Sequence, residues 1–168
     1  IMAVSMLTAC GGGGKAGALN LSEVNSIIHE NGDETDVKSS TTLNNALKSV
    51  ANTLKQSGNY NSDAAMAALT AIRHYPIQEN GNNWLSYRAG GAYAFSDVEM
   101  KAEGLTAEKI IALAILASEE ALENQLAGED FQNIKITNTF YAGAETVTAT
   151  NGALYWIIGF EFETKATA

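Results

Sequence analysis

The residues with the clearest potential for chemistry lie between positions 74 and 95. His74 follows a predicted helix, and Glu79 lies shortly after it in the same polar segment. An imidazole that shares a cleft with a carboxylate can act as a general base. A histidine at a helix end is explained equally well by its interaction with the helix dipole. The sequence leaves both interpretations open.

Aromatic side chains follow in the same region, interspersed with glycine and asparagine. Aromatic residues in such a segment can line a ligand groove. They can equally fill the core beneath a sheet, because large aromatic side chains are usually buried. The candidate ligand-binding residues are therefore Trp84, Tyr87, Tyr93, His74 and Glu79.

Other recognisable catalytic or ion-binding motifs are absent from the sequence. There is no G-x-S-x-G nucleophile motif, and the glycine run at 11–14 lacks the spacing of a phosphate-binding loop. The acidic residues at 33–36 lack the glycine and glutamate spacing of a calcium loop. The glutamates at 119–123 are expected to form a solvated face. We therefore predict no metal site, no cofactor and no catalytic residue.

The overall composition restricts the classes of partner. The formal net charge is −9, from 19 acidic and 10 basic residues. This charge argues against nucleic acid, because phosphate binding requires a basic surface. Hydrophobic residues make up 46% of the 168 positions, enough for one domain with a core. No apolar run reaches the roughly 18 residues of a membrane-spanning helix.

The only cysteine, Cys10, ends the stretch Leu7-Thr8-Ala9-Cys10 and precedes four glycines. This stretch resembles the lipobox of bacterial lipoproteins. The resemblance implies that a lipid is attached to Cys10 and that this residue becomes the mature N-terminus. The alternative is a buried cysteine on a strand, which the glycine run disfavours.

The lipobox resemblance also implies a domain organisation and a location. Residues 1–9 would be a signal-peptide remnant, 10–19 a glycine-rich lipid-anchored tether, and 20–168 the folded domain. The partner at this end of the chain would be the membrane, through the lipid on Cys10. We expect the domain to lie in the bacterial cell envelope, outside the cytoplasmic membrane.

Hydrophobic periodicity predicts four helices, at 23–31, 42–57, 62–75 and 106–127. Ser22 is the expected cap of the first helix, and Gly58 is the expected end of the second. The last helix is apolar on nearly all sides in its first half, which predicts deep burial.

Strand patterns dominate the final forty residues, and one short strand is expected earlier, at 92–95. Segments 131–140, 145–150 and 153–162 read as a C-terminal antiparallel β-meander, with Gly159 as a possible bulge. Asn151-Gly152 is a strong hairpin signal. The predicted fold class is α+β.

The order of these elements and several local motifs resemble the CAP superfamily, the SCP-like domain of cysteine-rich secretory and pathogenesis-related proteins. The resemblance covers about residues 19–162. It implies an α-β-α sandwich with the meander at the C-terminus. The matching stretches are VN at 24–25, LNNALKSVANTLKQSG at 43–58, AGGA at 89–92, TAEKII at 106–111 and GALYWIIGF at 152–160.

The departures from this family concern its cleft, which holds two histidines and two glutamates able to bind a divalent ion. The first histidine position falls at Asn61 or Ser62, and the first glutamate position falls at Gly91. The second glutamate position falls at Ala112, and the second histidine position at Ala121. Glycine and alanine side chains can neither bind a metal nor transfer a proton, so the resemblance implies a member that lacks the tetrad.

The sequence thus supports a lipid-anchored, non-catalytic CAP-like binding module. Its ligand would be a small apolar molecule, a cell-wall fragment or a protein. Two alternatives are a residual hydrolase that uses His74 and Glu79, and a purely structural surface lipoprotein.

Overall fold

A computed structural model describes residues 19–75, 86–126 and 135–167. The chain forms helices and one three-stranded antiparallel sheet, so the predicted α+β class is confirmed. The four predicted helices are present, and a short helix, α4, was not predicted. In chain order the elements are α1 (Leu21–Glu30), α2 (Thr41–Ser57), α3 (Ser62–Arg73), β1 (Ser86–Ser96), α4 (Asp97–Ala102), α5 (Ala107–Leu126), β2 (Lys135–Thr148) and β3 (Leu154–Thr167).

Polar side chains determine where the helices begin. Asn20 caps α1 by accepting a hydrogen bond from the Glu23 N–H, so the prediction of Ser22 as the cap was wrong by two residues. Ser40 and Asn61 cap α2 and α3 in the same way. These oxygens satisfy backbone N–H groups that have no partner within the helix.

The sheet has the strand order β1-β3-β2, with β3 in the centre. The predicted division of the C-terminal region into three strands was wrong, because β2 runs without a break from 135 to 148. The third strand is β1, which pairs with β3 from Ser86↔Lys165 to Ser96↔Tyr155. Pairing along this whole length makes β1 much longer than the four residues expected from its own sequence.

Two glycines in the sheet serve helix packing and do not form a turn or bulge. Gly143 and Gly159 are register partners on β2 and β3. Leu47 of α2 lies over both, and a Cβ at Gly159 would lie 2.6 Å from the Leu47 Cδ2. Only glycine allows the helix to approach this closely. This packing is the physical reason that Gly143 does not mark a strand end.

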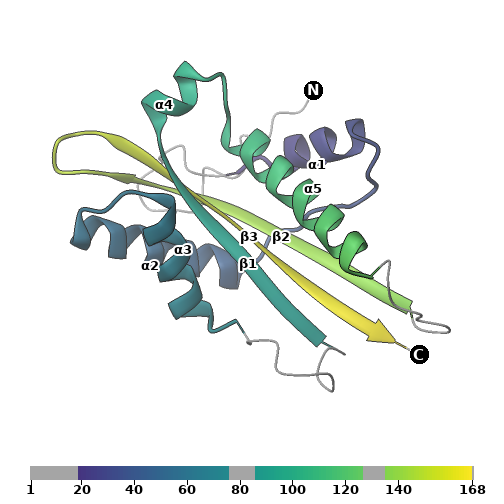
Figure 1. Cartoon of the computed structure of the whole chain (residues 1–168). Helices are drawn as coiled ribbons and strands as arrows, with labels where there is room; N and C mark the ends of the chain where they lie inside the picture. Colours follow the sequence, from purple (N-terminus) through teal and green to yellow (C-terminus); the bar gives the residue numbers. More distant parts are fainter. Residues whose placement is uncertain (1–18, 76–85, 127–134, 168) are drawn as a thin grey trace.

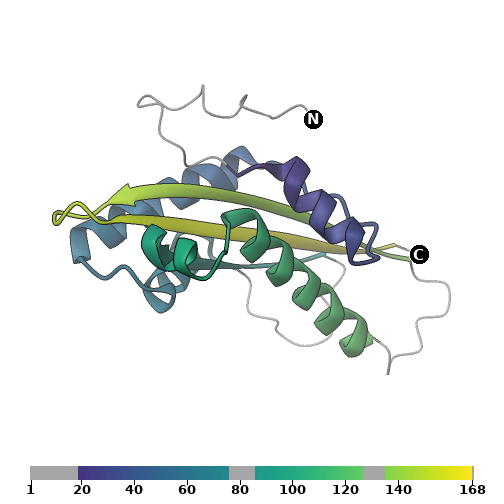
Figure 2. The same cartoon turned by 90° about the horizontal axis from the view of Figure 1, so that it is seen from above.

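The hairpin predicted at Asn151-Gly152 is confirmed and joins β2 to β3. Gly152 has φ +85°, a conformation that glycine adopts without strain. The Asn151 side-chain oxygen accepts a hydrogen bond from the Ala153 N–H at 3.0 Å. Figure 2 shows β2 and β3 running the length of the molecule, with the hairpin at one end.

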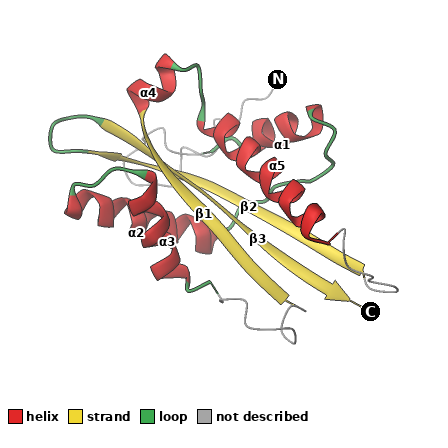
Figure 3. Ribbon diagram, in the orientation of Figure 1, coloured by secondary structure: helices red, strands yellow, loops and turns green. Residues whose placement is uncertain are grey.

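Helices cover both faces of the sheet (Figures 1 and 3). Alternate side chains of β3 point to opposite faces, as the pleat requires. Ile158, Phe160 and Phe162 join the core under α1 and α5, which we call the α1/α5 face. Ile157 joins the core under α2 and α3, which we call the α2/α3 face.

The Tyr-Trp pair of β3 connects the sheet to its surroundings on both faces. Tyr155 stacks on Tyr60, with ring centroids 4.4 Å apart. Trp156 donates its indole N–H to the Asp97 carboxylate at the start of α4, at 3.1 Å. The two residues therefore have structural contacts that account for both side chains.

Candidate functional site

His74 ends helix α3. Its backbone has φ +48°, and its N–H donates a hydrogen bond to the Thr70 carbonyl at 2.9 Å. This left-handed conformation is uncommon outside glycine, and it is the conformation that often ends a helix. The backbone of His74 therefore forms the C-terminal cap of α3. The imidazole is exposed. Glu79, its predicted partner, lies outside the described residues, as do Trp84 and Cys10.

Tyr93 and Tyr87 both belong to β1. Tyr93 is half-buried, packs against the core of the α1/α5 face and stacks on Phe95 with ring centroids 6.2 Å apart. The backbone of Tyr87 pairs with Thr164 of β3. Helix α3, which His74 ends, packs on the other face. The structure therefore places Tyr93 and His74 on opposite faces of the sheet.

A polar cluster on the α2/α3 face was missed by the sequence analysis. We call it the arginine cluster; its members are Arg73, Tyr75, Arg88 and Glu161. The Arg73 Nε lies 2.9 Å from the Glu161 Oε2, and the two side chains are 15% and 3% exposed. Glu161 raises the pKa of Arg73, chiefly through this hydrogen bond. The pair is thus a buried salt bridge between the end of α3 and the central strand.

The Tyr75 phenol lies in the space beside Gly90 of β1, where no side chain is present. A Cβ at Gly90 would lie 2.6 Å from the Tyr75 hydroxyl oxygen, so only glycine leaves room for the phenol. The hydroxyl oxygen is buried and has no hydrogen-bond partner among the described residues. Burial raises the pKa of Tyr75, and the charge of Glu161 adds to the rise. Tyr75 therefore stays protonated and remains a hydrogen-bond donor.

Arg88 supplies a second guanidinium. Its Nη2 donates to the Arg73 carbonyl at 3.4 Å, at the C-terminal end of α3, where a cation is favourable. Its Nε is buried and has no acceptor within the described parts of the chain. The cluster thus contains two unsatisfied donors, Tyr75 Oη and Arg88 Nε.

A second polar cluster joins the segment after α1 to helix α5. We call it the carboxyl pair; it consists of Asp33 and Glu119, bridged by Thr35. The Thr35 hydroxyl donates to the Glu119 Oε1, and the Thr35 N–H donates to the Asp33 Oδ1. Glu119 is only 9% exposed, so the expectation that it belongs to a solvated face was wrong. The loop that follows α1 covers this side chain, a contact that the sequence of α5 alone does not reveal.

The two carboxyl groups have different proton affinities. Burial raises the pKa of Glu119 from 4.5 to about 7, and Asp33 adds to the rise. The pKa of Asp33 is lowered, chiefly by its interaction with Glu119. Such a division is typical of two neighbouring carboxyl groups that hold one proton between them. At neutral pH, Asp33 is therefore ionised and Glu119 is partly protonated.

His29 lies close to the carboxyl pair, but its imidazole contacts Asp36 and not Asp33 or Glu119. Its Nε2 lies 3.0 Å from the Asp36 Oδ1, and both side chains are well exposed. Within the described ranges, no group of three or more His, Cys, Asp or Glu side chains is placed to hold a metal ion. The acidic segment 33–36 therefore serves contacts within the protein.

The positions at which the resemblance would place two histidines and two glutamates carry structural contacts or face solvent. The Ser62 hydroxyl bonds to the backbone of Ala94 and fixes α3 to β1. A Cβ at Gly91 would lie 3.0 Å from Met66 and 3.1 Å from Phe160. Ala112 is fully buried in the core of the α1/α5 face, and Ala121 is exposed.

A weak signal for the arginine cluster is present in the sequence. Glu161 interrupts the apolar stretch GFEF, and Arg73 ends the largely apolar stretch AAMAALTAIR. A charged residue in an apolar strand needs a partner, because an unpaired buried charge is costly. The sequence does not identify that partner, since 88 positions separate the two residues.

Comparisons of the chain with protein-family models, with curated proteins and with solved structures each gave no match. None of the described helices combines the length and hydropathy needed to cross a membrane.

Proposed function

We propose that this chain is a lipid-anchored, extracytoplasmic binding module of CAP-like architecture, without catalytic activity of its own. The proposed architecture is supported by the order of its elements, which are three helices, a strand, a short helix, a long helix and a terminal hairpin. The Cys10 lipobox supports the anchor. The ligand would be a small apolar molecule, a cell-wall fragment or a protein.

One observation carries the non-catalytic part of the proposal. At the two positions where the resemblance expects carboxylates, apolar side chains fill the space. Met66 and Phe160 approach Gly91, and Ala112 has no exposed surface. A metal-binding carboxylate at either position would require the surrounding core to move.

A zinc titration tests this part. We expect calorimetry on the full chain with zinc chloride to show no saturable binding, because the tetrad side chains are absent. The variant His74→Ala serves as the control for weak binding by an exposed imidazole. Stoichiometric binding that His74→Ala abolishes would support the residual hydrolase instead.

Membrane fractionation of the expressing bacterium tests the anchor. The wild-type protein should be found with membranes, and Cys10→Ser should move it to the soluble extract, because the thiolate is the site of lipid attachment. Ser118→Ala, on α5, is a control that leaves the lipobox intact. Continued sedimentation of Cys10→Ser with membranes would refute lipid anchoring.

A further inference from the structure

We infer that Arg88 and Tyr75 form a subsite for a carboxylate group of the ligand, on the α2/α3 face. The inference rests on the proposed binding function and specifies the chemistry of the ligand. It is drawn from two buried donors that the fold leaves without acceptors.

The first step concerns the charge balance of the arginine cluster. Arg73 and Glu161 neutralise each other at 2.9 Å. Arg88 lies within ion-pair distance of no carboxylate in the described part of the chain, although it is half-buried. A partly desolvated guanidinium without an anion is unfavourable. A ligand that brings one negative charge would remove this imbalance.

The second step concerns Glu163, the carboxylate opposite Arg88 in the register of the sheet. Glu163 lies opposite Arg88 in the register of β1 and β3, so both side chains are on the same face. Its carboxylate instead lies 3.4 Å from the Lys165 Nζ. The Glu163 carboxylate therefore lies beside Lys165 and forms no ion pair with Arg88.

The third step concerns Tyr75, the second donor. Its hydroxyl is buried in the same cluster and has no partner among the described residues. Because the phenol is protonated, it can donate one hydrogen bond to an incoming oxygen. The Arg88 Nε–H can donate another. Two donors of this kind match the two oxygens of a carboxylate.

The charge of the surroundings favours a monoanion. Arg73, Arg88 and Lys165 carry three positive charges and Glu161 and Glu163 carry two negative charges, so one positive charge is in excess. A phosphate dianion would be repelled by Glu161 and Glu163, whereas a carboxylate balances the excess charge. The net charge of −9 also disfavours an anionic lipid surface as the source of the ligand.

The Nε–H resonance of Arg88 provides a direct test in the full chain. Sodium acetate is the probe, and sodium chloride at equal ionic strength is the reference. We expect a saturable shift of the Arg88 signal with acetate and a smaller, non-saturating drift with chloride. A response that is identical for both salts would overturn the inference.

Two variants separate the contributions of the two donors. Tyr75→Phe should weaken acetate binding at least about tenfold, the value of one hydrogen bond to a charged acceptor. Arg88→Lys keeps the charge but loses the fork of donors, and should weaken binding about tenfold. Retained affinity in both variants would overturn the assignment. Near-ultraviolet circular dichroism reports whether each variant is folded.

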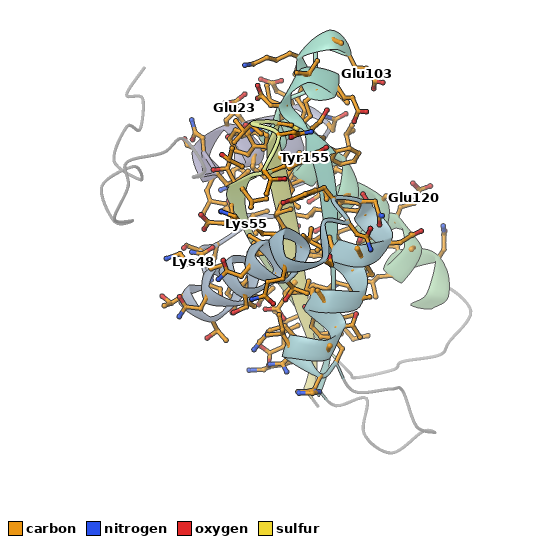
Figure 4. The ribbon with its side chains drawn as sticks, turned by 90° about the vertical axis from the view of Figure 1, so that its left-hand side faces the viewer. Glu23, Lys48, Lys55, Glu103, Glu120 and Tyr155 are labelled. Atoms are coloured by element: carbon orange, nitrogen blue, oxygen red, sulfur yellow. The ribbon has the colours of Figure 1, made fainter. Side chains whose placement is uncertain are left out.

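A matched control uses Lys55→Gln, which removes one positive charge from α2, where the side chain is exposed (Figure 4). Lys55→Gln should leave acetate affinity unchanged. Lys165→Gln should lower the affinity, because it releases Glu163 to pair with Arg88. Equal losses in the two variants would indicate general charge attraction and contradict a defined subsite.

The same titration with methyl phosphate distinguishes the ligand classes. Tighter binding of methyl phosphate than of acetate would contradict the carboxylate assignment. None of these outcomes depends on zinc or on the membrane. The inference and the proposed function can therefore fail separately.

Discussion

Glu161 and Glu119 are the two charged residues that the described structure buries, and they lie on opposite sides of the sheet. Glu161 faces a guanidinium, and its negative charge is balanced by Arg73. Glu119 faces another carboxylate, and its pKa rises to about 7. The fold therefore offsets the cost of burying a carboxylate in two different ways. The first is a partner of opposite charge, and the second is uptake of a proton.

The difference has a physical consequence for stability. A salt bridge between Arg73 and Glu161 keeps both groups charged over a wide pH range. The contact between Asp33 and Glu119 stabilises the fold only while one proton is held between the two carboxyl groups. We therefore expect the α2/α3 face to be insensitive to pH near neutrality and the α5 side to be sensitive.

Removal of the cation should have the largest effect. Arg73→Met leaves Glu161 buried without a partner, which should lower the free energy of unfolding by about 3–5 kcal/mol. Urea denaturation at pH 7 measures this loss. The double variant Arg73→Met/Glu161→Leu should regain most of it, because neither charge then remains buried. A loss below about 1 kcal/mol in the single variant would mean that water reaches Glu161.

A change of pH should have the next largest effect, through Glu119. Its pKa is higher in the folded chain than the ordinary value of 4.5, so its contribution to stability is fully present below pH 4.5. The contribution is lost as the pH rises through about 7. We expect the wild-type protein to lose about 1–3 kcal/mol between pH 5 and pH 8 relative to Glu119→Gln.

Asp33 does not cancel this trend. Its pKa is lowered from 3.8, so its stabilising contribution is lost only in acid, below the interval of the experiment. The other titrating groups are present in both the wild type and Glu119→Gln. Their contributions cancel when the free energies of unfolding of the two proteins are subtracted. Parallel stability curves for the two proteins between pH 5 and pH 8 would refute a protonated Glu119.

The smallest effect is expected from Thr35→Val, which removes the hydroxyl donor to Glu119. The expected loss is about 1 kcal/mol at pH 5. It should be larger at pH 8, because the hydroxyl lowers the pKa of Glu119 and so favours the ionised form. Thermal unfolding at the two pH values measures both losses.

The matched control is Thr42→Val, at an exposed position of α2. This variant makes the same chemical change away from any buried carboxylate. A loss for Thr35→Val that is equal at the two pH values would show that the hydroxyl contributes packing alone.

Local signals in the sequence predicted most of the helices and the hairpin. Stripes of apolar residues and polar caps act over a few residues, and so does the glycine that follows Asn151. The length of β1 could not be predicted in this way. Its residues are rich in glycine and alanine, and they form a strand because β3 pairs with them along its length.

The candidate site was predicted less well than the fold. The sequence indicated the region around His74 and Tyr93, but it did not reveal Arg73, Glu161 or Glu119. Each of these residues gains its role from a partner far away in the chain. Sequence spacing carries no information on such partners, because the sheet and the packing of α3 and α5 bring them together.

The amino-acid sequence by itself determined the acidic charge, the single cysteine in its lipobox-like setting, the α+β class and the positions of four helices. These properties depend on composition and on contacts within a few residues. The tertiary structure alone decided which charges are buried and what balances them. Both glutamates are buried by the fold, which supplies Arg73 as a partner of opposite charge for Glu161 and only another carboxyl group, Asp33, for Glu119.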